Sequence, residues 1–144
     1  MTAKLGQSNN SRYRYTKDFL WIEILSDEQV RVGITDFAQK NLGPIEYVEI
    51  IKKDFISLGE EFLIVESVKA VAPFFSPFSG RIKEINHKVI FDPSLINASK
   101  GRTWIIVMEL SKGELMERLK EGKAMTAEEA IVWQENLKKQ LKNS

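Results

Sequence analysis

One lysine, Lys69, lies at a predicted turn between two strand-like runs, where its amine is exposed for covalent chemistry. The run before it, 62–65, is apolar, and the run after it, 71–77, contains two prolines that exclude a helix. Residues 66–70 are therefore the predicted hairpin connection. A turn lysine taken alone is usually only solvent-facing. An exposed amine can also attack an activated acyl group and so become a tether.

The rest of the chain offers few groups for catalysis. It contains one histidine, His87, and no cysteine, so acid–base and nucleophilic pairs would have to rest on Ser, Lys, Asp or Glu. His87 lies in a polar connection and is predicted to be a surface residue. No His or carboxylate cluster has metal-ligand spacing, and there is no Gly-rich phosphate loop. We expect a non-catalytic protein without a metal site, which carries chemistry performed by other proteins.

Length and composition set broad limits on the class of protein. The 144 residues, 43% hydrophobic and 28% charged, suit one globular domain with a modest core. No apolar run approaches the length of a membrane span, and residues 1–14 are polar, so we expect a flexible leader rather than a secretory signal. The net charge of +1 is spread along the chain, which argues against nucleic acid as a partner. The expected localisation is the cytoplasm.

Hydrophobic periodicity predicts a strand-rich body. Alternation predicts strands at 20–25 and 29–34, joined by the turn 26–28, and Thr35 is a predicted cap for a short helix through Asn41. Further strands are predicted at 45–51, on both sides of Lys69, at 81–86 and at 103–110. The period is unclear at 81–86, because Ile82 and Ile85 are three residues apart.

The C-terminal part is predicted to be helical. One helix is expected at 113–121, and a longer one follows Thr126, which forms a capping box with Glu129. Apolar residues spaced three and four apart predict one stripe that packs on the strand body: Ala130, Trp133, Leu137 and Leu141. Trp133 is expected to be a core anchor and not part of a binding site. The pattern predicts a mostly β fold with C-terminal α-helices.

The segment Glu66-Ser67-Val68-Lys69-Ala70 resembles the lipoyl-attachment hairpin of the glycine cleavage system H protein family. The resemblance covers residues 15–111. It includes several further motifs in the order that the family uses: Tyr15-Thr16-Lys17 followed by Trp21, Val32–Gln39, Leu42-Gly43, Ser76–Gly80, Asp92–Asn97 and Trp104.

The resemblance implies a fold, a cofactor and a role. The fold is a barrel-sandwich hybrid of the lipoyl and biotinyl type, and residues 15–144 form a single carrier domain. The cofactor is lipoic acid, joined to Lys69 by an amide, which gives a chain without cysteine a reversible dithiol couple. Within the attachment turn we expect Glu66 to be a recognition charge, Ser67 to be part of the turn, Val68 to seat it on the body, and Ala70 to leave access.

By the same resemblance, the carrier shuttles an aminomethyl group in glycine catabolism. Its partners are glycine decarboxylase, aminomethyltransferase and dihydrolipoyl dehydrogenase, together with a lipoate ligase or a lipoyl or octanoyl transferase. We expect a monomer with no membrane partner. Biotin is disfavoured, because biotinyl domains flank their lysine with methionines and here the neighbours are Val68 and Ala70.

Three departures from the family pattern leave the pathway open. Phe19-Leu20 replaces His-Glu before Trp21, the loop 51–54 is basic, and 99–103 replaces an acidic Gly-rich loop. The basic residues predict an altered partner surface: Lys52, Lys53, Lys100 and Arg102. The alternatives are an H-like lipoate-binding protein of another pathway, such as heterodisulfide-reductase-like sulfur oxidation, and an unmodified interaction module.

Overall fold

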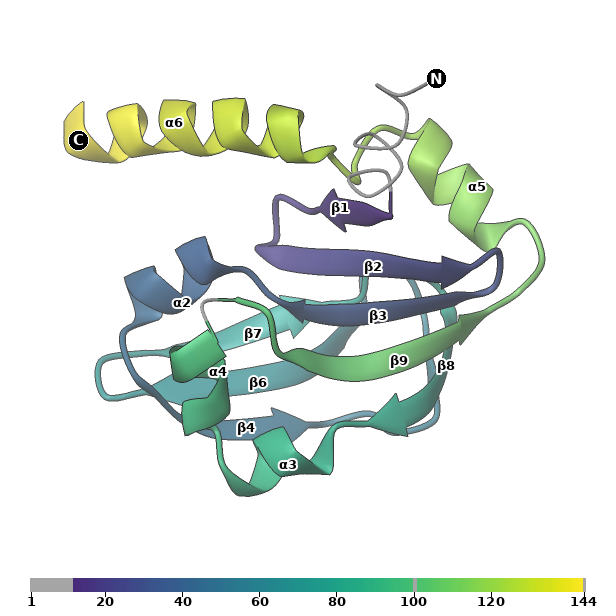
Figure 1. Ribbon diagram of the computed structural model, residues 1–144, viewed down its shortest axis with the longest axis horizontal. Coiled ribbons are helices and arrows are strands. Elements are labelled where there is room, and N and C mark those ends of the chain that lie inside the picture. The colour runs from purple at the N-terminus through teal and green to yellow at the C-terminus, as the bar shows by residue number, and fades with distance from the viewer. Residues whose placement is uncertain (1–11, 100, 144) are drawn as a thin grey trace.

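The computed structural model of the chain describes residues 12–99 and 101–143. Its elements, labelled in Figure 1, are β1 Tyr13–Tyr15, β2 Leu20–Ser26, β3 Gln29–Ile34, α2 Asp36–Leu42, β4 Ile45–Ile50, β5 Phe55–Ile56, β6 Glu61–Ser67, β7 Val71–Phe75, β8 Gly80–Ile85, α3 His87–Phe91, α4 Ser94–Ser99, β9 Trp104–Leu110, α5 Glu114–Lys120 and α6 Ala127–Asn143.

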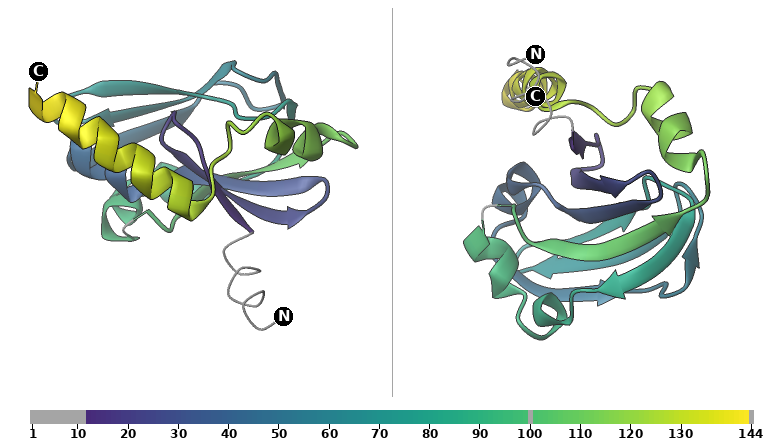
Figure 2. Two further views of the ribbon diagram at one scale, coloured as in Figure 1. Left: turned by 90° about the horizontal axis from the view of Figure 1, so that it is seen from above. Right: turned by 45° about the vertical axis from the view of Figure 1, so that its right-hand side comes forward.

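Two antiparallel sheets face each other across one core. The larger sheet has the order β1-β2-β3-β9-β8-β5, and the smaller has the order β4-β6-β7. Figure 1 shows β2, β3 and β9 above β7, β6 and β4, and Figure 2 shows α6 outside the larger sheet. This arrangement confirms the predicted sheet-dominated fold with C-terminal helices.

Alternation of apolar residues builds the core between the sheets. Leu20 and Ile22 on β2 point inward, as do Leu63 and Val65 on β6, and each is at most 1% exposed. Phe62 is fully buried as well. Complete burial of such side chains stabilises the fold by roughly 1.5–3 kcal/mol each. The hairpin that carries Lys69 is therefore anchored in the core by β6.

The predicted helix caps are confirmed. The Thr35 hydroxyl accepts a hydrogen bond from the Ala38 amide at 3.2 Å, so α2 begins at Asp36. At α6 the Thr126 hydroxyl accepts from the Glu129 amide, and the Thr126 amide donates to the Glu129 carboxylate at 2.9 Å. This second bond holds the pKa of Glu129 below its ordinary value.

A β-bulge explains the unclear period at 81–86. The register between β8 and β9 shifts between Ile82 and Glu84, so Ile82 and Ile85 do not follow a period of two. The sequence pattern also missed β5, α3 and α4, which are too short to carry a periodic signal.

The boundary predicted for the leader was placed too late. Residues 1–11 lie outside the described residues, but Tyr13 and Arg14, which we assigned to the leader, belong to β1. Tyr13 pairs with Glu23, and Tyr15 pairs with Trp21, so β1 is formed by pairing with β2 and has no hydrophobic pattern of its own. The single-domain assignment of residues 15–144 stays a prediction.

The stripe on α6 packs on the body only near its start. Ala130 is 4% exposed, and the Trp133 ring contacts Phe19, but Leu141 is 60% exposed. Trp133 is half-buried and does not belong to the main core cluster. The prediction of one packed stripe was therefore wrong for its C-terminal end. Figure 1 shows why, since α6 runs past the strands toward α2.

Candidate functional site

The turn between β6 and β7 is organised by Ser67. Its amide donates to the Ala70 carbonyl at 2.8 Å, which closes the hairpin. Its hydroxyl oxygen accepts from the amides of Lys69 at 3.3 Å and Ala70 at 3.2 Å. A serine at this position thus satisfies the turn's own amide donors, and the tip does not need contacts with the body to keep its shape.

Lys69 is exposed at this tip, and its Nζ forms no ion pair with a described residue. Its stem lies beside the end of α2: a Cβ placed on Gly43 would lie 4.0 Å from Lys69 Cε. Gly43 has φ 81°, a backbone conformation that glycine adopts without strain. The amine is therefore accessible to a large modifying enzyme.

The neighbours of Lys69 do not all take the places that we expected. Val68 is 74% exposed, so the expectation that it seats the turn on the body was wrong. Ala70 is half-buried. Glu66 pairs across the sheet with Tyr47 on β4 and Val71 on β7, so its carboxylate shares the outer face of the smaller sheet with two exposed apolar side chains.

An apolar cavity of about 450 Å³ begins beside the attachment turn. Its walls come from α2, β7, the β1–β2 connection and α6, and they include Leu42, Ala72, Pro73, Phe75 and Leu137. Leu42 directly precedes Gly43, and Ala72 follows Ala70 by two residues. No local sequence pattern indicates this cavity, because its walls join four elements that are distant in the chain.

The departures at positions 19 and 20 are apolar residues that are half-buried at Phe19 and fully buried at Leu20. Phe19 has φ 69°, which is unusual for a residue other than glycine, and its ring stacks on Phe37 of α2 at 5.7 Å. Phe19 therefore links the start of β2 to α2, and neither residue forms part of an exposed charged surface.

The basic departures do not form one surface around Lys69. Lys52 and Lys53 follow β4 at the end of the smaller sheet opposite the attachment turn, since Ile45 pairs with Ser67 and Ile50 with Leu63. Lys52 is also paired with Glu60 at 2.8 Å. Lys100 lies outside the described residues. Arg102 is exposed, on the loop before β9.

Other classes of site have little support within the described ranges. Among those residues no group of three or more His, Asp or Glu side chains is placed to hold a metal ion. His87 is exposed at the start of α3, as predicted. No described helix is long and apolar enough to cross a membrane.

Comparison with known proteins decides the family. Residues 13–131 match the family described as glycine cleavage H-protein. The chain belongs to this family. Among its curated relatives, the glycine cleavage system H protein of Coprothermobacter proteolyticus is 40% identical over 118 residues, covering 81% of this chain and 89% of that one. The probable glycine cleavage system H protein of Pyrococcus horikoshii is 42% identical over 109 residues, covering 74% and 79%.

A solved structure supports the same assignment. The crystal structure of a glycine cleavage system H protein from Mycobacterium marinum is 32% identical and covers 82% of this chain and 92% of that chain, with a TM-score of 0.69. The resemblance inferred from the attachment motif and the predicted fold are therefore both confirmed. Members of the H-protein family are carrier subunits of a multienzyme system.

Proposed function

We propose that the chain is the lipoyl carrier of a glycine cleavage system, with lipoic acid attached to Lys69 through an amide. The observation that carries this proposal is the exposed amine of Lys69 at the tip of a hairpin whose turn is held by Ser67. A rigid tip presents a long arm in a defined direction, and an exposed amine admits the ligase or transferase that attaches it.

The residues around Lys69 fit a lipoyl group. When bound, lipoic acid supplies a reversible disulfide–dithiol couple, which accepts and releases the aminomethyl group. Lys69 serves only as its anchor, since the amide removes the charge of the amine. The apolar cavity beside the turn offers the hydrocarbon part of the arm a surface away from water, with Leu42 and Ala72 at its near side.

The chain's own residues position the lipoyl arm and recognise the partner enzymes, and they do not catalyse the chemical steps. Its single histidine, His87, lies at the exposed start of α3, and the chain has no thiol. We assign the chemical steps to the partners of the family's pathway, which are glycine decarboxylase, aminomethyltransferase and dihydrolipoyl dehydrogenase. Glu66, with the exposed Tyr47 and Val71 beside it, is the patch next to Lys69 that we assign to partner recognition.

Glycine–bicarbonate exchange with a purified glycine decarboxylase tests this function. We expect lipoylated wild-type protein to support exchange and the Lys69→Arg variant to support none, because a guanidinium stays protonated and forms no amide. The unlipoylated wild-type protein is the matched control. A lipoylated chain that supports no exchange would contradict the glycine cleavage role.

A lipoate-binding role in another pathway is the second candidate. The observation that favours it is the burial of Leu20, where the family pattern has an acidic residue. Failure of exchange together with lipoylation of Lys69 would favour this candidate. Failure of lipoylation itself would favour an unmodified interaction module.

A further inference from the structure

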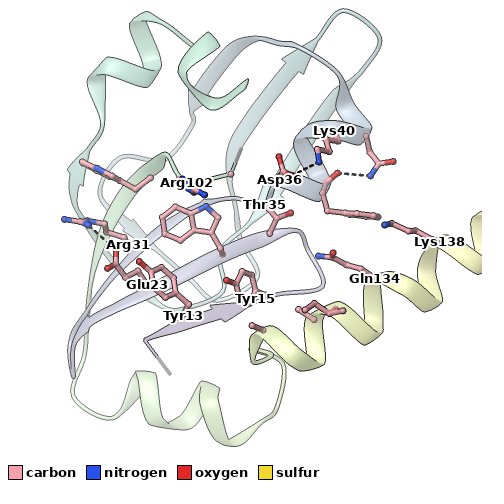
Figure 3. A pocket seen from close by; sticks show the side chains of 18 of the residues that line it. Tyr13, Tyr15, Glu23, Arg31, Thr35, Asp36, Lys40, Arg102, Gln134 and Lys138 are labelled. Atoms are coloured by element: carbon pink, nitrogen blue, oxygen red, sulfur yellow. Dashed lines mark hydrogen bonds and ion pairs between the residues drawn. The ribbon is translucent and has the colours of Figure 1, made fainter. Parts of the chain in front are cut away.

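A second and larger cavity, of about 990 Å³, lies between the outer face of the larger sheet and α6. We call it the aromatic cavity. Its floor is formed by side chains of β1, β2, β3 and β9, one wall by α2 and the loop 101–102, and the opposite wall by α6. In Figure 3 Gln134 and Lys138 point from α6 toward the sheet and α2, with Tyr13 and Tyr15 on the strand below and Arg102 across from them. Lys69 is not part of its lining.

The floor presents flat rings. Trp21 is 6% exposed and lies directly over Gly33, where an added Cβ would come within 2.4 Å of the indole ring. Tyr13 lies against Trp21 with ring centroids 6.3 Å apart, and Trp104 lies beneath the Arg31 guanidinium at 5.8 Å. Aromatic and guanidinium planes of this kind stack on a planar ligand.

Several donors of the lining lack acceptors, and one lining acceptor, Asp36 Oδ1, lacks a donor among the described residues. Within the described residues Trp21 Nε1 and Arg31 Nε are buried without a hydrogen-bond partner. Arg102 and Gln134 also form no hydrogen bond or ion pair between described residues that would occupy their side chains. A buried donor without an acceptor is destabilising, so a ligand that brings acceptor oxygens would relieve this deficit.

The charge balance of the lining favours an anion. Four basic residues line the cavity, and the two acidic ones are already paired: Glu23 with Arg31 at 3.1 Å, and Asp36 with Lys40 at 3.0 Å. Lys138 lies 3.8 Å from the Glu135 carboxylate on the same helix. Arg102 is therefore the lining cation that has no ion pair among the described residues. Burial raises the pKa of Tyr15, so its hydroxyl stays protonated at neutral pH and adds another neutral donor.

The chain does not supply such an anion from its own N-terminal segment. Residues 1–11 contain no acidic and no aromatic residue. The α6 wall lies in part outside the residues that match the H-protein family, since the match ends at residue 131 and the wall includes Gln134, Lys138 and Leu141. The cavity thus combines the shared strand face with a helix segment beyond the family match.

We propose that the aromatic cavity binds a small planar organic anion, in which an aromatic ring carries a carboxylate or a phosphate group. The ring stacks on the aromatic floor, and the anionic group meets Arg102 and the donors of the α6 wall. A volume of this order accommodates a ligand of mononucleotide size.

Titration of the unlipoylated full chain with adenosine 5′-monophosphate and with benzoate tests this proposal. Two compounds are controls: adenosine carries the planar ring without the charge, and inorganic phosphate carries the charge without the ring. The readout is the three indole N–H signals in a proton–nitrogen correlation spectrum. We expect both planar anions to shift Trp21 and Trp104 saturably, with a dissociation constant below about 1 mM for the tighter one. Trp133 lies outside the lining and should not shift.

Two variants separate specific binding from general charge effects. Arg102→Gln should weaken binding about tenfold, because it removes a charge-assisted hydrogen bond. Lys112→Gln changes an exposed lysine that does not line the cavity and should bind as wild type does. The Lys69→Arg variant should also bind as wild type does, so this result is independent of lipoylation. The proposal is overturned if neither planar anion shifts Trp21 and Trp104 saturably, if adenosine or phosphate alone binds equally well, or if Arg102→Gln leaves binding unchanged.

Discussion

The rings of Phe19 and Trp133 lie 5.5 Å apart, centroid to centroid, with their planes tilted by 41°. Phe19 stands where the family pattern has a histidine, and Trp133 lies two residues beyond the part of the chain that matches the family. The contact therefore joins a departure in the strand region to the C-terminal segment of α6. It attaches α6 to the connection between β1 and β2.

We predict that this contact can be measured by a double-mutant cycle. Phe19→Leu and Trp133→Leu should each lower the free energy of unfolding, with a coupling of about 0.5–1.5 kcal/mol between them. Urea unfolding of the four proteins gives this coupling. Val132→Ala, on the exposed face of α6 one residue away, is the control and should have little effect. Additive effects of the two substitutions would mean that α6 is not held by this pair.

Ser67→Ala should loosen the attachment turn. The substitution removes the acceptor for the Lys69 and Ala70 amides and should lower the free energy of unfolding by about 1 kcal/mol. It should also slow modification of Lys69, because the amine is then presented in many directions. Ser57→Ala is the matched control, since its hydroxyl makes no hydrogen bond with a described side chain or backbone group. Equal stability and equal modification rates in the two variants would count against the role of Ser67.

Gly33→Ala should destabilise the fold by roughly 1–3 kcal/mol, because the new Cβ would lie 2.4 Å from the Trp21 ring. The indole N–H resonance of Trp21 should also shift in this variant. Trp21→Phe removes the part of the ring that clashes. Gly33→Ala should therefore lower the free energy of unfolding less in the Trp21→Phe background than in the wild-type protein. If Gly33→Ala is as stable as wild type, the indole does not lie on this glycine.

Glu23 should contribute stability that depends on pH. Burial acts to raise the pKa of this carboxyl, but the hydrogen bond from Arg12 at 2.7 Å and the charge of Arg31 outweigh it, so its pKa lies below the ordinary 4.5. A lowered folded-state pKa stabilises the protein above about pH 4.5, and this stabilisation is lost as the pH falls through the folded value. Glu23→Gln should therefore lower the free energy of unfolding by roughly 1–3 kcal/mol at pH 7.

The difference between wild type and Glu23→Gln should shrink as the pH falls below 4.5. Urea unfolding at a series of pH values measures this difference. Glu49→Gln, at an exposed position whose carboxylate forms no ion pair with a described residue, is the control. A difference that is constant down to pH 3 would contradict the ion-pair account.

Much of the body could be predicted from local patterns. The side-chain caps at Thr35 and Thr126 predict where two helices begin, and the alternation in β2 and β3 predicts which side chains face the core. Both patterns could be found in the sequence because they involve residues that are close together in the chain. The attachment turn was found from its motif, and Ser67 explains why that motif forms a turn.

The remaining features depend on distant contacts. β1 forms because Tyr13 and Tyr15 pair with β2. The bulge after Ile82 shifts the register in which β8 pairs with β9. Both cavities are lined by α6 together with α2 and other elements that lie far from it in the sequence, so no short window of sequence contains them. The helical stripe indicated where α6 would pack, but it did not indicate that Leu141 would be 60% exposed.

The central claim is that Lys69 is the attachment site of a lipoyl group. Its most direct test is intact-mass measurement and peptide mapping of the full chain after exposure to a lipoate ligase or a lipoyl transferase system. We predict one lipoyl group, on the peptide containing Lys69, and none in the Lys69→Ala variant. A lipoyl group found on another lysine, or a wild-type chain that stays unmodified while a known H protein in the same mixture is lipoylated, would contradict the claim.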